Sequence, residues 1–144
     1  MAEPLALVLE SSISEIPQMN EILAGYLSSH GIPEEDILDM QLAVEEAVTN
    51  IIRHGYHGGP GEIRITCTVH SDSIETVIRD EAIPFNPLLL PPPDIDTDTM
   101  DRPIGGLGVM LIRNLMQDVR YRFEEPHNIL TLIRERKSPQ DIPD

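Results

Sequence analysis

Cysteine, aromatic residues and basic residues are all scarce in this sequence of 144 residues. The single cysteine, Cys67, excludes an intramolecular disulfide and a cysteine-rich zinc site. Tryptophan is absent and only 3% of the residues are aromatic, so the core has to be built mainly from aliphatic side chains and methionine. Because Cys67 falls within the alternating segment EIRITCTVH, we expect it to be a packed core residue.

Basic residues are outnumbered by acidic ones. Ten lysines and arginines face 25 aspartates and glutamates, which gives a formal net charge of -15. This charge argues against non-specific binding to nucleic acid or to an anionic membrane. It leaves two alternatives open, a basic protein partner or an acidic surface that serves solubility alone.

The chain also lacks the patterns of secretion and of membrane insertion. No positively charged segment followed by an apolar stretch opens it, and no apolar run approaches about 18 residues. We therefore expect a soluble, cytoplasmic protein.

The hydrophobic patterns predict one domain over residues 1–136, with a long loop or lid at about 81–104 and a flexible tail at 137–144. The elements expected in order are a strand at 5–10, helices at 14–29 and 33–55, strands at 62–70 and 73–80, a helix within 106–119 whose periodicity begins at Val109, and strands at 120–125 and 128–136. Segregated helices and strands predict an α+β, two-layer α/β sandwich in which helices cover one face of a mixed sheet. A doubly wound fold would need regular alternation of strand and helix, which this order lacks.

A polar sector on the expected helix 33–55 is the first candidate site. At about 100 degrees per residue, Glu46, Asn50 and Arg53 fall on one side of that helix. Magnesium prefers oxygen ligands and often takes only one or two from the protein, which suits Asn50, while Glu46 could orient or deprotonate a hydroxyl. The alternative is a solvated polar face. The apolar stripe nearly opposite consists of Met40, Val44, Ala47, Val48 and Ile51.

Two further segments have the composition of ligand-binding loops. Asp80 ends a predicted strand, where its carboxylate could accept a hydrogen bond from an amino group such as that of adenine; the alternative is a turn-capping aspartate. Gly105, Gly106 and Gly108 directly precede a predicted helix, an arrangement that favours phosphate binding. The alternative for these glycines is a hinge and helix cap. The segment is neither a Walker loop nor a Rossmann fingerprint.

Taken in order, these segments resemble the ATP-binding domains of the gyrase and histidine-kinase (GHKL) superfamily. Within it, residues 5 to 135 resemble the small anti-sigma-factor serine/threonine kinases. The segment EAVTNIIRHGY is similar to the asparagine box of that family, and GGLGVMLIRNLMQDVRY to its second glycine box. The resemblance implies a GHKL ATPase sandwich that binds ATP and Mg2+.

The resemblance also implies roles for individual residues. Glu46 would be the catalytic carboxylate, and Asn50 would ligate magnesium. The other residues implied in cofactor binding are Arg53 and His54, which add charge near the phosphates, Asp80 and Ala82 beside the adenine, and Gly105, Gly106, Leu107 and Gly108 around the phosphates. The implied reaction transfers the γ-phosphoryl group of ATP to a serine or threonine of an anti-anti-sigma-factor partner. A sigma factor and a second copy of the chain are further partners that the resemblance implies, with the helix at 14–29 as the candidate dimer face.

The sequence departs from the family at its first glycine box. Ala82 and Pro84 stand where glycines are usual, and proline removes a backbone donor. This motivates an alternative, a non-catalytic partner-binding regulatory module with a degenerate nucleotide site. An ATPase domain serving a histidine-kinase pathway is a third hypothesis, which the absence of a dimerising hairpin with a phosphoacceptor histidine disfavours. The five histidines have no zinc-binding spacing, so His54 and His57 are expected at the surface or beside the phosphates.

Overall fold

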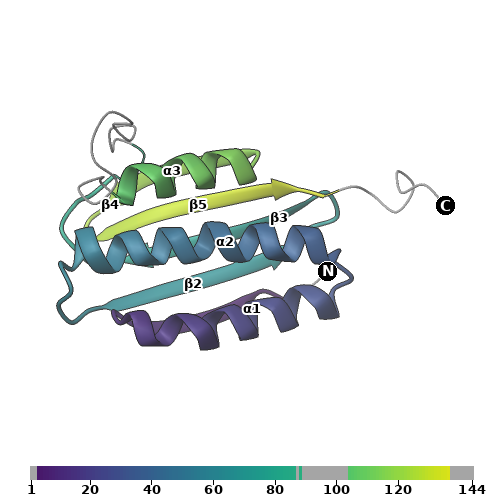
Figure 1. Ribbon diagram of the computed structural model, residues 1–144, viewed down its shortest axis with the longest axis horizontal. Coiled ribbons are helices and arrows are strands. Elements are labelled where there is room, and N and C mark those ends of the chain that lie inside the picture. Colours follow the sequence, from purple (N-terminus) through teal and green to yellow (C-terminus); the bar gives the residue numbers. More distant parts are fainter. Residues whose placement is uncertain (1–2, 87, 89–103, 137–144) are drawn as a thin grey trace.

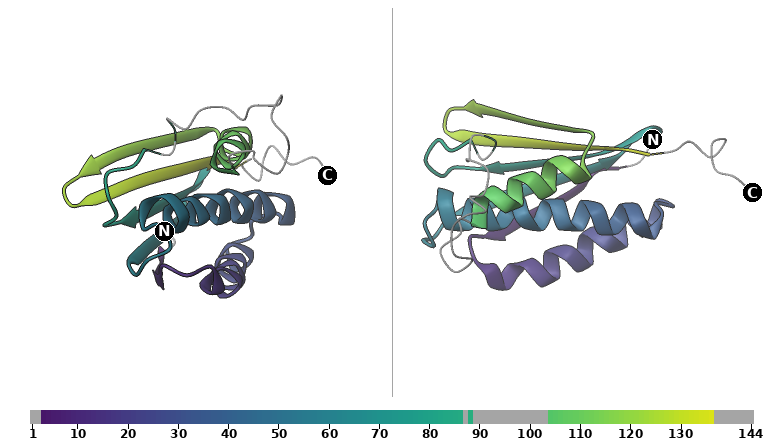
Figure 2. Two further views of the ribbon diagram at one scale, coloured as in Figure 1. Left: turned by 60° about the vertical axis from the view of Figure 1, so that its left-hand side comes forward. Right: turned by 45° about the horizontal axis from the view of Figure 1, so that its top comes forward.

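Three helices lie against one face of a five-stranded sheet (Figure 1 and Figure 2). The structure is a computed structural model and describes residues 3–86, 88 and 104–136. In chain order its elements are β1 (Leu5–Glu10), the 3-10 turn η1 (Ile13–Glu15), α1 (Ile16–Ser29), α2 (Glu34–Asn50), the π-helix η2 (Ile51–Gly55), β2 (Glu62–Val69), β3 (Ser73–Asp80), α3 (Ile104–Leu115), β4 (Asp118–Glu124) and β5 (His127–Glu135). The tail and most of the lid expected from the sequence lie outside the described residues.

The strand order in the sheet is β1-β2-β3-β5-β4. All four pairings of the described strands are antiparallel. The two-layer α+β sandwich with helices on one face is confirmed, and the sheet expected to be mixed is antiparallel in its described part. Two of the pairings follow from the connections, because the hairpins β2-β3 and β4-β5 can join only antiparallel neighbours, while β1-β2 and β3-β5 are paired across helical connections.

The core lies between the helices and the inner face of the sheet. Side chains of β2 and β3 alternate between buried and more exposed positions, as the period of a strand with one covered face requires. The stripe expected on α2 is buried throughout. Cys67 is also fully buried, as expected, and burial raises the pKa of its thiol to about 11.

The helix ends follow the local sequence. Helix α1 has Pro17 in its first two positions and is followed by Gly31, whose φ of 76 degrees is the left-handed conformation common after a helix end. Helix α2 begins after Pro33 with three acidic residues in its first turn, where the helix dipole favours negative charge.

One ion-pair cluster ties the helices to the sheet. The Arg134 guanidinium on β5 lies 2.8 Å from Asp36 Oδ1 and 2.9 Å from Asp39 Oδ2, both on α2. The same guanidinium donates a 2.7 Å hydrogen bond to the carbonyl of Leu115 at the end of α3. Helices α2 and α3 are thus held beside one another over β5. Within the described ranges, no helix is long and apolar enough to cross a lipid bilayer.

Candidate functional site

A small cavity lies where α2 passes into η2, against the ends of β3 and β5. It brings Asn50 and Asp80 together, although they are far apart in the sequence. The residues that line it are Asn50, Ile51, Asp80, Phe85, Tyr121, Asn128 and Leu130. Its volume of about 10 Å³ corresponds to roughly one water molecule. The cavity is therefore a small pocket between the two layers, with mainly apolar walls and a few polar side chains.

Asn50 is buried, with 3% of its surface exposed, which excludes the solvated polar face as its environment. Its amide nitrogen Nδ2 has no hydrogen-bond partner among the described residues. A buried amide without a partner is costly unless a ligand supplies one. Asn50 therefore suits a ligand that enters this cavity. Its amide oxygen is a type of ligand that magnesium binds.

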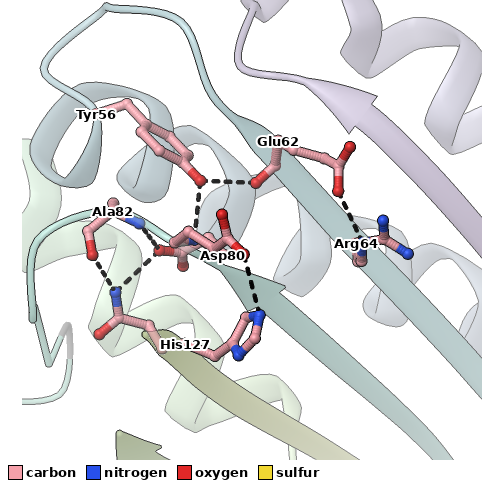
Figure 3. Close-up of polar contacts among 8 residues, drawn as sticks. Tyr56, Glu62, Arg64, Asp80, Ala82 and His127 are labelled. Carbon is pink, nitrogen blue, oxygen red and sulfur yellow. Dashed lines mark hydrogen bonds and ion pairs between the residues drawn. The ribbon is translucent and has the colours of Figure 1, made fainter. Parts of the chain in front are cut away.

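Asp80 is held in place at the end of β3, with 5% of its surface exposed. Its Oδ1 accepts hydrogen bonds of 2.9 Å from the amide of Ala82 and of 2.9 Å from Asn128 Nδ2. Figure 3 shows Tyr56 on one side of this strand end and His127 on the other. Burial raises the pKa of Asp80, while the bonds from Asn128 and Ala82 and the charge of His127 act in the lowering direction. The carboxylate has an orientation fixed through one oxygen, so its other oxygen is available to a ligand amino group.

Asn128 and Tyr121 are site residues that the sequence analysis missed. Asn128 Nδ2 also donates to the carbonyls of Ala82 and Ile83, at 3.2 and 3.1 Å, and its Oδ1 accepts from the Phe85 amide and from the Tyr121 hydroxyl. The signal was an asparagine at an inward position of β5, in line with Leu130 and Leu132. Asn128 fastens the segment after β3 to β5 and thereby positions Asp80.

Glu46 lies one turn before Asn50 but faces a different hollow, an open groove of about 350 Å³ between α2 and the start of α1. The groove is lined by Ile13, Ile16, Pro17, Glu45, Glu46, Thr49 and Arg53. Partial burial and the neighbouring charge of Glu45 raise the pKa of Glu46, and Arg53 acts in the lowering direction. A half-buried carboxylate with a raised pKa, beside a cation, suits acid–base chemistry at the groove.

The turn from α2 into the sheet is a π-helix, a rare element that is frequent at functional sites. It brings Gly55 against Ala82, because a Cβ at Gly55 would lie 3.0 Å from the Ala82 Cβ. The Ala82 side chain thus packs on Gly55, and Ala82 does not line the cavity. Tyr56 follows; its hydroxyl donates to the Glu62 carbonyl at 2.7 Å and accepts from the Glu81 amide at 2.9 Å.

His54 and His57 take different positions. The His54 ring stacks on Phe85 with a distance of 5.8 Å between ring centroids, so it packs beside the cavity without lining it. His57 is exposed in the turn after η2, with a φ of 53 degrees. Within the described part of the chain, no three His, Cys, Asp or Glu residues gather as a metal site.

The glycine-rich segment lies inside α3 instead of preceding it. Helix α3 begins at Ile104, so Gly105, Gly106, Leu107 and Gly108 belong to its first turns. The expectation that the glycines precede the helix was therefore wrong by a few residues. The first four amides of a helix have no partner within the helix whichever residues occupy it. Figure 1 shows this end of α3 on the side of the molecule where α2 passes into the π-helix.

The chain matches known proteins over most of its length. The histidine kinase-like ATPase domain family matches residues 9–134. The serine-protein kinase RsbW of Bacillus mycoides (strain KBAB4) is 34% identical over 112 residues, which are 75% of this chain and 70% of that protein. The serine-protein kinase RsbW of Bacillus cereus (strain AH187) is 35% identical over the same shares.

One solved structure has a similar fold. It is the crystal structure of the RsbU and RsbW domains of Rv1364c from Mycobacterium tuberculosis, with a TM-score of 0.66 and 18% sequence identity. The match covers 95% of this chain and 34% of that chain, so this chain spans about a third of the solved protein. At this identity the likeness concerns the fold alone.

Proposed function

Because the chain belongs to the histidine kinase-like ATPase family and, within it, to the family of the serine-protein kinase RsbW, we propose that it is an ATP-dependent serine/threonine protein kinase. Its substrate would be a serine or threonine of an anti-anti-sigma-factor protein. A sigma factor as a second partner and a homodimer as the working form belong to the same proposal.

The observation that carries the proposal is the cavity shared by Asn50 and Asp80. Both polar residues are buried, and the Asn50 amide nitrogen lacks a partner there. Asn128, which lines the same cavity, has its amide nitrogen bonded within the protein, whereas the amide nitrogen of Asn50 is left for another partner. A nucleotide would supply an acceptor for the N–H groups of Asn50 and an amino group for the second oxygen of Asp80, while the amide oxygen of Asn50 would hold the metal ion.

Each side chain then has a role. The Asp80 carboxylate accepts from the adenine amino group, and Asn128 holds it in orientation. Asn50 would ligate Mg2+, which would neutralise phosphate charge when bound. The amides of the first turns of α3, from Gly105 to Gly108, receive the phosphates because a helix start favours anions.

Glu46 is the general base, and its position at the separate groove gives the reaction a direction. The acceptor hydroxyl approaches from the groove of α1 and α2, while the nucleotide lies on the cavity side. Glu46 takes the proton of the acceptor hydroxyl while the hydroxyl oxygen forms a bond to the γ-phosphorus of ATP. The bond between that phosphorus and the ADP leaving group breaks. Arg53, in the same groove, supplies positive charge near the transferring group.

Calorimetric titration with ATP, with and without magnesium, is the first test. We expect binding that requires magnesium in the wild-type chain and is weakened in Asn50→Ala. The second step incubates the chain and Glu46→Ala with ATP and an anti-anti-sigma-factor protein, and seeks phosphoserine by mass spectrometry. Binding without transfer in both proteins would favour the alternative function, a partner-binding module regulated without turnover, which the residues Ala82 and Pro84 motivate.

A further inference from the structure

The outer face of the sheet, opposite the helices, holds a groove in which arginines outnumber acidic residues, with Arg79, Arg120 and Arg122 against Glu75. Of the ten lysines and arginines of the chain, four arginines lie on this face: Arg64, Arg79, Arg120 and Arg122. No helix of the described residues covers it (Figure 2). We infer that this arginine face is a docking surface for an acidic segment of a partner protein, an inference that goes beyond the proposed kinase function and does not depend on it.

The register of the strands places the arginines in rows across the sheet. Arg64 on β2 is directly opposite Arg79 on β3, and Arg79 and Arg122 both pair with Ile129 on β5, from its two sides. In the next row, Arg120 on β4 pairs with Thr131, which pairs with Val77 on β3. Two like charges directly opposite each other on one face are unfavourable. A carboxylate between the two guanidiniums would relieve that repulsion.

The acidic residues of the same face leave these arginines available. Glu62, Asp118 and Glu124 each contact one arginine of their own strand through its Nε atom: Arg64 at 2.7 Å, Arg120 at 2.6 Å and Arg122 at 3.4 Å. These pairs are exposed, and a guanidinium has five N–H donors, so most donors remain free for a ligand. Glu75 contacts His70, and the two further acids of the face, Glu10 on β1 and Glu135 at the end of β5, do not line the groove. Arg79, in the centre of the face, has no acidic partner among the described residues.

The face also has an apolar floor. A groove of about 460 Å³ runs over it, lined by Glu75, Val77, Arg79, Arg120, Tyr121, Arg122, Ile129 and Thr131. Ile129 points outward, yet only 3% of its surface is exposed. Its partners on the neighbouring strands are Arg79 and Arg122, and arginine has an apolar stem able to cover such a side chain. An occupant that combines carboxylates with a small apolar side chain matches this chemistry. A long nucleic acid does not, because the face also carries carboxylates and the whole protein has a charge of -15. The carboxylates belong to Glu10, Glu62, Glu75, Asp118, Glu124 and Glu135.

Fluorescence anisotropy with the full chain and a labelled peptide of alternating glutamate and leucine tests the inference. We expect binding that weakens with added salt, and weakens about fivefold in Arg79→Ser and in Arg120→Ser. Arg113→Ser, which removes the same charge from the exposed end of α3, is the matched control and keeps the wild-type affinity. A peptide with serine in place of leucine should bind more weakly than the parent peptide.

Three results would overturn the inference. They are no binding of the peptide up to about 1 mM, an equal loss in Arg113→Ser, or tighter binding of a DNA duplex of similar charge. Arg79 lines neither the cavity nor the groove of Glu46, so ATP titration of Arg79→Ser should match the wild type. Failure of ATP binding in the wild type would contradict the proposed kinase function without touching this inference.

Discussion

Asn50 and Asn128 line the same cavity and are about equally buried, with 3% and 4% of their surfaces exposed, but only the amide nitrogen of Asn128 has hydrogen-bond partners among the described residues. Asn128 Nδ2 donates to Asp80, Ala82 and Ile83, while Asn50 Nδ2 has no partner in the described chain. The first asparagine is part of the construction of the pocket. The second has the properties of a residue kept for a ligand.

Replacement of Asn50 by alanine should separate ligand binding from stability. We expect magnesium-dependent ATP affinity to fall by at least about 10- to 100-fold, the loss that follows when a residue supporting a metal ligand is removed. Because Nδ2 donates no hydrogen bond within the described protein, the free energy of unfolding should change by less than about 1 kcal/mol. Calorimetry and urea unfolding give the two values. A large loss of stability with unchanged ATP affinity would identify Asn50 as a structural residue.

The matched replacement of Asn128 by alanine should have the opposite balance. It leaves Asp80, the Phe85 amide and the Tyr121 hydroxyl without their partner, at a cost of about 3 kcal/mol of unfolding free energy. ATP affinity should fall as well, because Asp80 loses its orientation. Tyr121→Phe removes only one of these bonds and should cost about 1 kcal/mol. Stability of Asn128→Ala equal to wild type would contradict the positioning role.

Replacement of Asp80 by asparagine should raise the free energy of unfolding at neutral pH and weaken ATP binding. Burial raises the pKa of Asp80 in the fold, so the stabilisation from this group is present in acid and is lost as the pH rises through the folded pKa. Asparagine keeps an acceptor for Ala82 and Asn128, so we expect a gain of about 1 kcal/mol at neutral pH. That gain should vanish in acid.

ATP binding by Asp80→Asn should weaken about 100-fold, because an amide nitrogen would face the adenine amine. Thermal unfolding over a pH series and calorimetry measure the two effects. A loss of stability at neutral pH would show that the ionised carboxylate is favourable in the fold.

The pH dependence of phosphoryl transfer should report the surroundings of Glu46. Arg53 lowers its pKa and Glu45 raises it, and a general base works only when deprotonated. The acidic limb of kcat/KM should therefore move to higher pH in Arg53→Gln and to lower pH in Glu45→Gln. Kinase assays over a pH series with saturating ATP measure the acidic limb of each variant and of the wild type. Shifts in the same direction would remove Glu46 from the role of base.

Replacement of Ala82 by glycine should leave ATP affinity within about threefold of the wild type. The Ala82 methyl packs on Gly55 and does not line the cavity, so its removal does not enlarge the site. Glycine would instead loosen the segment after β3. Calorimetric titration measures the affinity. A gain of tenfold or more would mean that this alanine had weakened the nucleotide site, which favours the non-catalytic alternative.

The sequence predicted the elements because their causes are local. Alternation in the segments of β2 and β3, the apolar stripe of α2 and glycine or proline at the ends are visible within a few residues. These local patterns were enough to predict the two-layer fold class and to identify the residues on which the family resemblance rests. The antiparallel sheet and the start of α3 at Ile104 differ from the expectation, because pairing and helix ends depend on contacts beyond a short window.

Only the tertiary structure decided which polar residues lie together in the same site. Glu46 and Asn50 are neighbours on one helix, yet the start of α1 forms a groove beside Glu46, while β3 and β5 close a cavity over Asn50. Asp80 on β3 is paired with Asn128 on β5, although a long stretch of chain separates the two residues in the sequence. The four arginines of the outer face also gather only through strand register. The sequence thus determined which side chains are present and which local elements hold them, and packing of distant segments determined which of them meet.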